Sequence, residues 1–203
     1  SYSENFGEDL FVNYFFKDVK GGFYIDIGCN LPKNSSLTYL LYKKGWRGIN
    51  VDISKRVINL NKVIRPRDIN LNISIGKEEK IVNSYIFYDN CSMNTVDKKF
   101  SEYTQKSVNK KPKIVKIQQH MLDSVLEKFK VNKINYLNID VEGNEMNTLD
   151  GFSLHKFNPD LVSIEIHDKI CPPLSNKIYK YFLDKKYYLV SIYGWTYFFS
   201  KKN

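Results

Sequence analysis

The chain has 203 residues, of which 42% are hydrophobic and 26% charged, and its formal net charge is +9. This composition is typical of a folded soluble protein, and no apolar run is long enough to cross a bilayer, so we expect no membrane insertion. Three widely spaced cysteines without a C-x-x-C pair argue against a disulfide framework and a zinc site. The first twenty residues lack the features of a signal peptide, which predicts a cytoplasmic protein.

Short β-branched or aromatic runs alternate with segments of helical spacing along the chain. Strands are predicted over residues 23–27, 48–53, 69–76, 84–88, 113–118, 134–140, 161–167, 187–193 and 196–200. Helices are predicted over residues 5–19, 35–45, 57–64, 121–130, 144–152 and 175–186. This order predicts an α/β fold with a mostly parallel sheet, in which the last two strands form an antiparallel hairpin.

The length of the chain favours a single domain over residues 1–203, with a helical segment over 1–20 and a Rossmann-like core over 21–203. In the first predicted helix Asn5 and Glu8 resemble a capping pair. Phe6, Leu10 and Tyr14 share one face of that helix, which is the pattern of an amphipathic helix.

The segment between residues 89 and 112 is predicted to be a polar loop. Seven lysines lie between Lys98 and Lys116, and Glu102 is the one acid among them. Two interpretations stay open: a solvated basic face, or a binding patch for an anionic partner such as a nucleic acid.

Two aspartates stand at the ends of consecutive predicted strands, in FYIDIG and GINVDI. In an open α/β sheet the ligand lies beyond the carboxyl ends of the strands. Gly28 would let the backbone approach a ligand, and Asp52 could accept hydrogen bonds from two ribose hydroxyls. No further glycine follows Gly28 in CNLPKNSS, which argues against a dinucleotide and favours an adenosine cofactor without phosphates. The simpler alternatives are a buried, hydrogen-bonded Asp26 and a helix-capping Asp52.

A second group of ionisable residues occurs in NIDVEGNE and IEIHD. Residues two apart in a strand face the same side, so Asp140 with Glu142, and Glu165 with His167, could project together from adjacent strand ends. Removal of a proton from an alcohol needs a base or a metal ion that binds the hydroxyl, and this group could supply either. The alternatives are a helix cap for Glu142 and an exposed surface position for His167.

These residues resemble the FkbM-type family of class I S-adenosylmethionine-dependent methyltransferases. The resemblance covers most of the chain and is most specific in LYKKGWRGINVD and NIDVEGNE. It implies a Rossmann-like fold with a mostly parallel seven-stranded sheet, a C-terminal antiparallel hairpin and helices on both faces.

The resemblance also implies S-adenosylmethionine as cofactor. The loop after the first strand would contact its methionine moiety, Asp52 its ribose, and the next two residues its adenine. The residues implied in cofactor binding are Asp26, Gly28, Cys29, Asn30, Ser36, Asp52, Ile53 and Ser54. We interpret Cys29 as small filler and not as a nucleophile. Relatives often have His-Pro where this chain has Leu31-Pro32, and Asn-Pro where it has Ser54-Lys55.

The resemblance suggests O-methylation of a sugar hydroxyl in surface polysaccharide or glycan biosynthesis, so the acceptor would be a small molecule or a glycan. Asp140, Glu165 and His167 are the predicted catalytic residues, acting as a base or by holding Mg²⁺ or Mn²⁺. One alternative is a methyltransferase for RNA or another nucleic acid, prompted by the net charge. Another is a non-catalytic module that binds an adenosine cofactor. The sequence does not specify the oligomeric state.

Overall fold

The computed structural model describes residues 1–3, 6–89, 91–167 and 174–201. The helices are α1 Glu8–Phe15, α2 Tyr39–Lys43, α3 Lys55–Ile64, α4 Lys98–Val108, α5 Leu122–Lys128, α6 Glu145–Asp150, α7 Leu154–Phe157 and α8 Lys177–Asp184. The strands are β1 Phe23–Ile27, β2 Arg47–Val51, β3 Ile69–Leu71, β4 Ser74–Ile75, β5 Lys80–Ile86, β6 Lys113–His120, β7 Tyr136–Ile139, β8 Leu161–Glu165, β9 Tyr187–Tyr193 and β10 Thr196–Lys201. No helix among these residues is long and apolar enough to span a bilayer.

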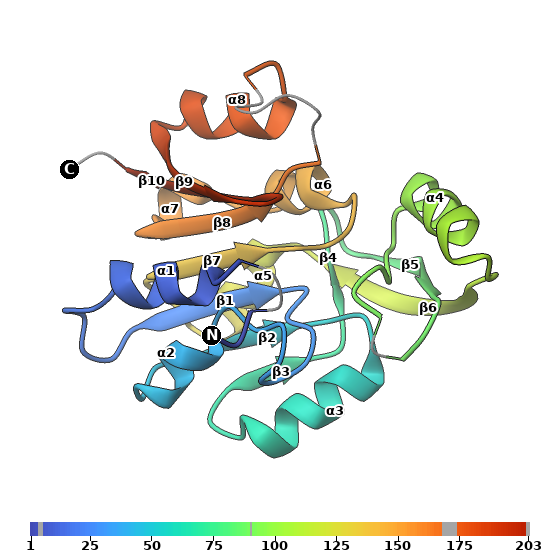
Figure 1. The fold of residues 1–203 in the computed structure, drawn as a ribbon, viewed down its shortest axis with the longest axis horizontal. Helices are drawn as coiled ribbons and strands as arrows, with labels where there is room; N and C mark the ends of the chain where they lie inside the picture. The colour runs from blue at the N-terminus through green and yellow to red at the C-terminus, as the bar shows by residue number, and fades with distance from the viewer. Residues whose placement is uncertain (4–5, 90, 168–173, 202–203) are drawn as a thin grey trace.

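Seven strands form one sheet in the order β3-β2-β1-β7-β8-β10-β9 (Figure 1). Strand β1 pairs in parallel with both β2 and β7, whereas β10 is antiparallel to β8 and to β9. The predicted seven-stranded, mostly parallel sheet with a C-terminal hairpin is therefore confirmed. The chain runs outward from β1 to β3 and later returns to β7 on the other side of β1. This reversal makes the carboxyl ends of β1 and β7 the expected place for a ligand.

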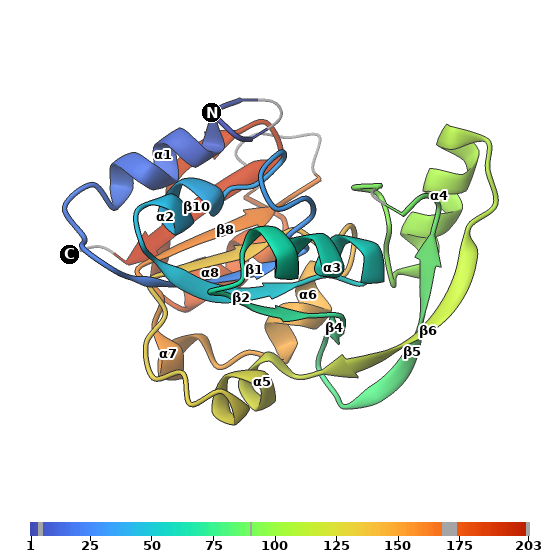
Figure 2. The same ribbon diagram turned by 90° about the horizontal axis from the view of Figure 1, so that it is seen from below.

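Helices cover both faces of this sheet, as predicted (Figure 2). On one face Tyr24 and Tyr136 pack with Val12 and Phe16 from α1 and its C-terminal end, and with Leu41 of α2. The apolar residues of the other face pack against α5, α6, α7 and α8. Because both faces are covered, the central strands are buried almost completely.

The face of α1 that the sequence suggested as apolar is turned outward. Phe6, Leu10 and Tyr14 are 59%, 50% and 67% exposed, whereas Val12 and Phe16 are buried. The segment carries apolar residues on two sides. The side with Val12 and Phe16 packs against the sheet, and the other side is exposed. The prediction of this face was wrong, because periodicity alone cannot choose between two apolar stripes.

Several predicted boundaries also shift. Helix α1 begins at Glu8, after Gly7 in a left-handed conformation with φ 76°, and Asn5 lies outside the described residues. The helix predicted over 35–45 is confined to α2. The strand predicted over 69–76 divides into β3 of the main sheet and β4 of a second sheet.

The second sheet has three strands in the order β4-β6-β5, and α4 lies on the connection between β5 and β6 (Figures 1 and 2). The prediction of a loop over 89–112 was therefore wrong for residues 98–108. Asp97 caps α4, since its Oδ1 accepts a hydrogen bond of 2.7 Å from the Phe100 amide. The residues of α4 that are fully buried, Ser101 and Thr104, are both polar, so the usual apolar signal of a helix is weak there.

Candidate functional site

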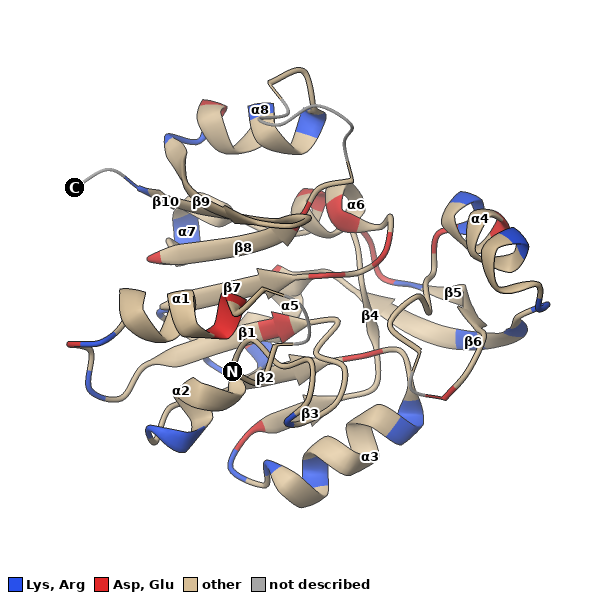
Figure 3. Ribbon diagram, in the orientation of Figure 1, with Lys and Arg blue, Asp and Glu red and all other residues tan. Residues whose placement is uncertain are grey.

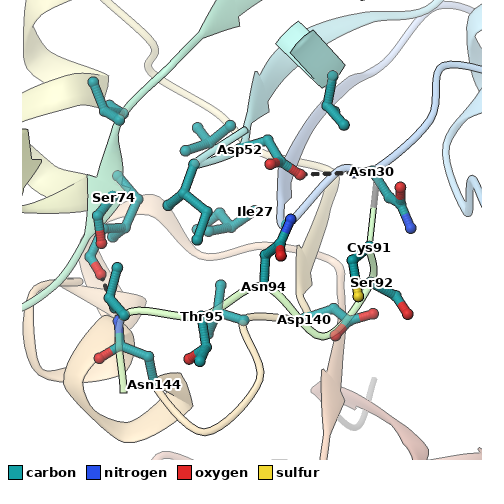
Figure 4. A pocket seen from close by; sticks show the side chains of 18 residues that line it. Ile27, Asn30, Asp52, Ser74, Cys91, Ser92, Asn94, Thr95, Asp140 and Asn144 are labelled. Atoms are coloured by element: carbon teal, nitrogen blue, oxygen red, sulfur yellow. Dashed lines mark hydrogen bonds between the residues drawn. The ribbon is translucent and has the colours of Figure 1, made fainter. Parts of the chain in front are cut away.

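A cavity of about 600 Å³, including its open mouth, lies beyond the carboxyl ends of β1, β2 and β7. It is bounded by the main sheet on one side and by residues 91–96, which belong to the β5–β6 connection, on the other (Figure 4). Several apolar side chains line it: Ile27, Val51, Ile53, Val57, Ile73, Ile75, Val96 and Val141. Asp52 and Asp140 line the same cavity, so two of the predicted acids face one space.

Asp52 lies just beyond β2 and is anchored by two backbone amides. Its Oδ2 accepts a hydrogen bond of 3.1 Å from Asn30 N (Figure 4). Its Oδ1 accepts one of 2.7 Å from Ser54 N. Burial raises the pKa of Asp52 to about 6. The carboxylate is thus fixed in orientation at the cavity wall, and each oxygen retains a lone pair for a further donor. The cap of α3 is Ser54, which accepts from Val57 N, so the alternative of a capping Asp52 is wrong.

Gly28 brings the ends of β1 and β7 together. Its φ is +80°, and an added Cβ would lie 1.7 Å from the backbone oxygen of Asp140. Gly28 N donates to Val51 O, and Asp140 N donates to Ile27 O, each at 2.9 Å. The absence of a side chain at Gly28 therefore allows the two segments to cross closely, and this crossing places Asp140 at the cavity.

Asp26 is the residue before the last of β1; it is buried and does not line the cavity. Thr38 Oγ1 donates to its Oδ2 at 2.6 Å, and Asn138 Nδ2 donates to its Oδ1 at 2.9 Å. Desolvation raises the pKa of Asp26, and the charge of Arg65 opposes that shift. These hydrogen bonds connect β1 to β7 and to the start of α2. They agree with the alternative of a buried, hydrogen-bonded acid, although the donors are side chains and not backbone amides.

Three other predicted cofactor residues also lie outside the cavity lining: Cys29, Ser36 and Ser54. Ser36 is buried and accepts hydrogen bonds from Arg65 Nη1 at 3.3 Å and Tyr39 N at 3.2 Å. Cys29 packs against Val57 of α3, and desolvation raises the pKa of its thiol well above the usual value. A thiol in this environment is inert filler, as interpreted from the sequence. The lining does include the predicted residues Gly28, Asn30, Asp52 and Ile53.

Register explains which acids reach the cavity. Asp26 pairs with Asn50 and Asn138 within the sheet, and Ser163 continues this buried row on β8. Ile27 pairs with Val51 and Ile139, and Ile139 pairs with Ile164. The next residues outward form a third row at the sheet edge: Gly28, Asp52, Asp140 and Glu165. The two acids that line the cavity, Asp52 and Asp140, therefore belong to this outer row.

Four carboxyl groups and one imidazole meet at the ends of β7 and β8. This acid–histidine cluster consists of Asp140, Glu142, Glu145, Glu165 and His167. Glu165 Oε2 lies 2.9 Å from His167 Nε2, and Glu142 Oε2 lies 3.9 Å from the same nitrogen. Asp140 lies next to Glu165, and in its protonated form it can donate a hydrogen bond to that carboxylate. The predicted juxtaposition of these strand ends is present, and Asp140 connects the cluster to the cavity.

The cluster binds protons more tightly than isolated carboxyl groups would. Burial and the charge of Glu165 raise the pKa of Asp140 well above its usual value, and burial with the same neighbour raises that of Glu142 to about 8. The hydrogen bond with Glu165 raises the pKa of His167. Figure 3 shows acidic residues around the start of α6, opposite the lysines of α4. Carboxyl groups with raised pKa values beside an imidazole are suited to general acid–base chemistry.

Glu142 adopts a strained backbone conformation that turns its side chain toward His167. Its φ is 53°, Gly143 follows with φ 94°, and Thr95 Oγ1 donates to Glu142 O at 2.7 Å. The cap position of α6 is Asn144, without a side-chain capping bond, so the alternative of a capping Glu142 is wrong. Strain of this kind is typical of functional sites.

Glu142, Glu165 and His167 also form a possible metal-binding group, since one ligand atom of each lies within 4.8 Å of the others. Two carboxylates and one imidazole suit a divalent cation such as Mn²⁺, and carboxylates alone suit Mg²⁺. The cluster could therefore act in either of two ways: by holding a divalent cation, or by removing a proton directly through one of its carboxylates.

Sequence reasoning missed the side of the site that is formed by the β5–β6 connection. Asn94 and Thr95 line the cavity and are held by hydrogen bonds within and beside that connection. Phe100 of α4 and Trp195 of the β9–β10 turn contact the His167 ring. Their positions depend on the second sheet and on the hairpin, and no local motif in the sequence marks them.

The comparison with known families covers this whole region. The family model described as "Methyltransferase FkbM domain" matches residues 6–189, which include every acid of the cavity and of the cluster. No curated protein matches the chain.

Proposed function

Because the chain belongs to the FkbM methyltransferase family, we propose that it transfers the methyl group of S-adenosylmethionine to a sugar hydroxyl in polysaccharide or glycan biosynthesis. The observation that carries this proposal is one cavity with Asp52 on its wall and Asp140, linked to the acid–histidine cluster, on another part of its lining. The first acid suits the ribose of a nucleoside cofactor, and the second suits removal of a proton from an acceptor.

The cavity fits the adenosine part of such a cofactor. It is lined mainly by apolar side chains with a few polar groups among them, as small-molecule sites usually are. Ile53, Ile73 and Ile75 offer apolar contacts to a flat base, and Asp52 can accept two ribose hydroxyls. Bound S-adenosylmethionine supplies an electrophilic methyl group on a sulfonium sulfur. The residues of this chain bind it, orient it and prepare the acceptor.

Asp140 is the residue best placed to take the acceptor proton. It lines the cavity and lies next to Glu165, and Glu165 Oε2 in turn lies 2.9 Å from His167 Nε2. A proton accepted by Asp140 can therefore be shared with a second carboxylate and an imidazole. The metal alternative uses the same cluster: a cation held by Glu142, Glu165 and His167 would lower the pKa of a bound hydroxyl.

The test is a methyl-transfer assay with S-adenosylmethionine and a panel of nucleotide sugars and glycans, read out by product mass. A mass increase of one methyl group on a sugar oxygen supports the proposal. A protein that binds the cofactor but methylates no sugar contradicts the acceptor assignment. Binding without turnover on any acceptor would favour the non-catalytic cofactor-binding module.

A nucleic-acid acceptor is the second candidate, and one observation favours it. All seven lysines between Lys98 and Lys116 are exposed, and they lie on α4, on β6 or between them. Helix α4 also contacts the cluster through Phe100 and His167. Methyl incorporation into RNA, together with a gel shift that weakens steeply with salt, would support this candidate. Sugar methylation without an RNA shift would exclude it.

A further inference from the structure

Two aromatic side chains border the acid–histidine cluster. The ring of Trp195 lies 5.6 Å from that of His167, and the ring of Phe100 lies 6.0 Å from it. Trp195 is 53% exposed, whereas the other tryptophan, Trp46, is fully buried. A large apolar ring is thus presented to solvent directly beside a group of carboxylates.

The main sheet holds Trp195 in this position. Ile166 N donates a hydrogen bond of 2.9 Å to Trp195 O, and the next residue, Thr196, pairs with Glu165 across β10 and β8. The backbone that carries the exposed ring is therefore attached to the same strand end that carries Glu165 and His167. Such an attachment fixes the ring relative to the cluster, as a binding surface requires.

A line of contacts leads from the cavity to this ring. Asp140 lines the cavity and lies next to Glu165. Glu165 Oε2 lies 2.9 Å from His167 Nε2, and the His167 ring contacts the Trp195 ring. An acceptor whose hydroxyl reaches Asp140 from the side of Glu165 would rest its remaining atoms against the surroundings of the cluster. Those surroundings combine apolar ring faces with hydrogen-bonding carboxylates and an imidazole.

We propose that Trp195 and Phe100 form an acceptor subsite that packs against the apolar C–H face of a pyranose ring, with the ring hydroxyls directed toward His167 and Glu165. A pyranose has one apolar face and a rim of hydroxyls, which matches an aromatic ring beside polar acceptors. The inference rests on the proposed sugar O-methylation and assigns its specificity-determining residues.

The first test uses tryptophan fluorescence, because Trp195 is exposed and Trp46 is not. Methyl pyranosides are titrated into the protein loaded with S-adenosylhomocysteine, with acrylamide quenching as readout. We expect saturable protection of the exposed tryptophan and a blue shift of its emission. In Trp195→Phe, where Trp46 alone emits, the response should vanish. The proposal is overturned if no pyranoside protects Trp195, or if only nucleotides or ammonium compounds do.

The second test is kinetic. Trp195→Ala should raise KM for a pyranoside acceptor by about 2- to 13-fold, because packing against an aromatic ring contributes about 0.5–1.5 kcal/mol. Trp195→Phe should recover part of this loss, and Phe100→Ala should resemble Trp195→Ala. The matched control is Tyr14→Ala, which removes an exposed ring on α1. An unchanged acceptor KM in Trp195→Ala overturns the proposal.

The two proposals fail in different ways. Protection of Trp195 by pyranosides without any methylated product supports the subsite and contradicts only the proposed reaction. Sugar methylation with neither fluorescence protection nor a KM effect supports the reaction and overturns the subsite. Cofactor affinity, measured by calorimetry, should be unchanged in Trp195→Ala, since Trp195 does not line the cavity.

Discussion

Asp52 is the side chain on which cofactor affinity should depend most. Each charge-assisted hydrogen bond to a ribose hydroxyl contributes roughly 1.5–3 kcal/mol, so Asp52→Ala should weaken binding of S-adenosylmethionine by at least about tenfold. Isothermal titration calorimetry measures this directly. Asp89→Ala is a suitable control, because Asp89 forms an exposed ion pair with Arg56. Equal affinity of Asp52→Ala and the parent protein would remove the ribose assignment.

The affinity should also depend on pH through Asp52. Burial raises its pKa to about 6 from 3.8, so near pH 6 half of the unliganded protein carries a neutral carboxyl there. Cofactor affinity should increase as pH rises through about 6 and then level off, whereas Asp52→Asn should bind weakly without this increase. Because the folded pKa exceeds the unfolded one, the contribution of Asp52 to stability decreases as pH rises from about 4 to about 6. Calorimetry from pH 5 to pH 8 checks the binding profile.

Asp140 should govern turnover more than cofactor binding. A positioned base contributes about 10²- to 10⁴-fold in rate, so Asp140→Asn should lose activity on that scale and keep most of its cofactor affinity. His167→Ala should lose less if His167 only orients Glu165. The exposed Asp150→Asn serves as control. Parental turnover in Asp140→Asn would show that this acid is structural.

A chelator separates the two ways in which the cluster could act. Loss of activity with EDTA, restored by Mg²⁺ or Mn²⁺, would assign a cation to Glu142, Glu165 and His167. Activity that is indifferent to EDTA would leave Asp140 as the direct base.

At the scale of elements, the crossing of β1 and β7 should be sensitive to a single methyl group. Gly28→Ala combines a positive φ with an overlap between Cβ and the backbone of Asp140. Gly21→Ala is the matched control, because its φ is +66° but no atom lies within 4 Å of its Cβ. Both variants should show the backbone cost of roughly 1 kcal/mol, and Gly28→Ala should lose about 1–3 kcal/mol more through overpacking. Equal melting temperatures of the two variants would contradict this account.

The elements that the sequence predicted well are those with a regular apolar period. Strands β1, β7 and β8 consist mostly of apolar residues, and β2 follows a helical segment and carries β-branched residues at its end, so their existence and their order were predictable. Helix α4 was missed because its buried side chains are polar, and the outward face of α1 was misjudged because tertiary packing chose between two apolar stripes. The second sheet is formed by pairing distant segments, which no local pattern specifies.

The candidate site was predictable to the level of strand ends but not of register. Asp26 and Asp52 look equivalent in sequence, yet Asp26 aligns with Asn50 inside the sheet, and Asp52 lies one residue beyond β2. A difference of two residue pairs along the strands thus separates a buried structural acid from one that faces the cavity. The pairing of Asp140 with Glu165 followed from the parallel order of β7 and β8, which the sequence did indicate.

At the scale of the whole molecule, one buried cation connects the segments beneath the site. Arg65 is fully buried at the C-terminal end of α3, and its Nε donates to Asp68 Oδ2 at 2.8 Å. Its Nη2 donates to Tyr24 OH at 2.6 Å and to Thr38 Oγ1 at 2.9 Å. Thr38 in turn donates to Asp26, so α3, β1 and α2 share one hydrogen-bonded network.

Removal of this cation should destabilise the protein more than any surface change. Arg65→Met leaves Asp68 and Asp26 buried without their countercharge, and breaking a buried pair costs about 3–5 kcal/mol. For a chain of this size that corresponds to a fall in melting temperature of roughly 6–20 °C. Arg56→Met is the control, since the pair of Arg56 with Asp89 is 66% exposed on both sides and should contribute at most about 1 kcal/mol. A similar melting temperature for Arg65→Met and Arg56→Met would mean that the network does not hold these segments together. A large difference would show that the position of Asp26, and with it the floor beneath the cavity, depends on a cation outside the site.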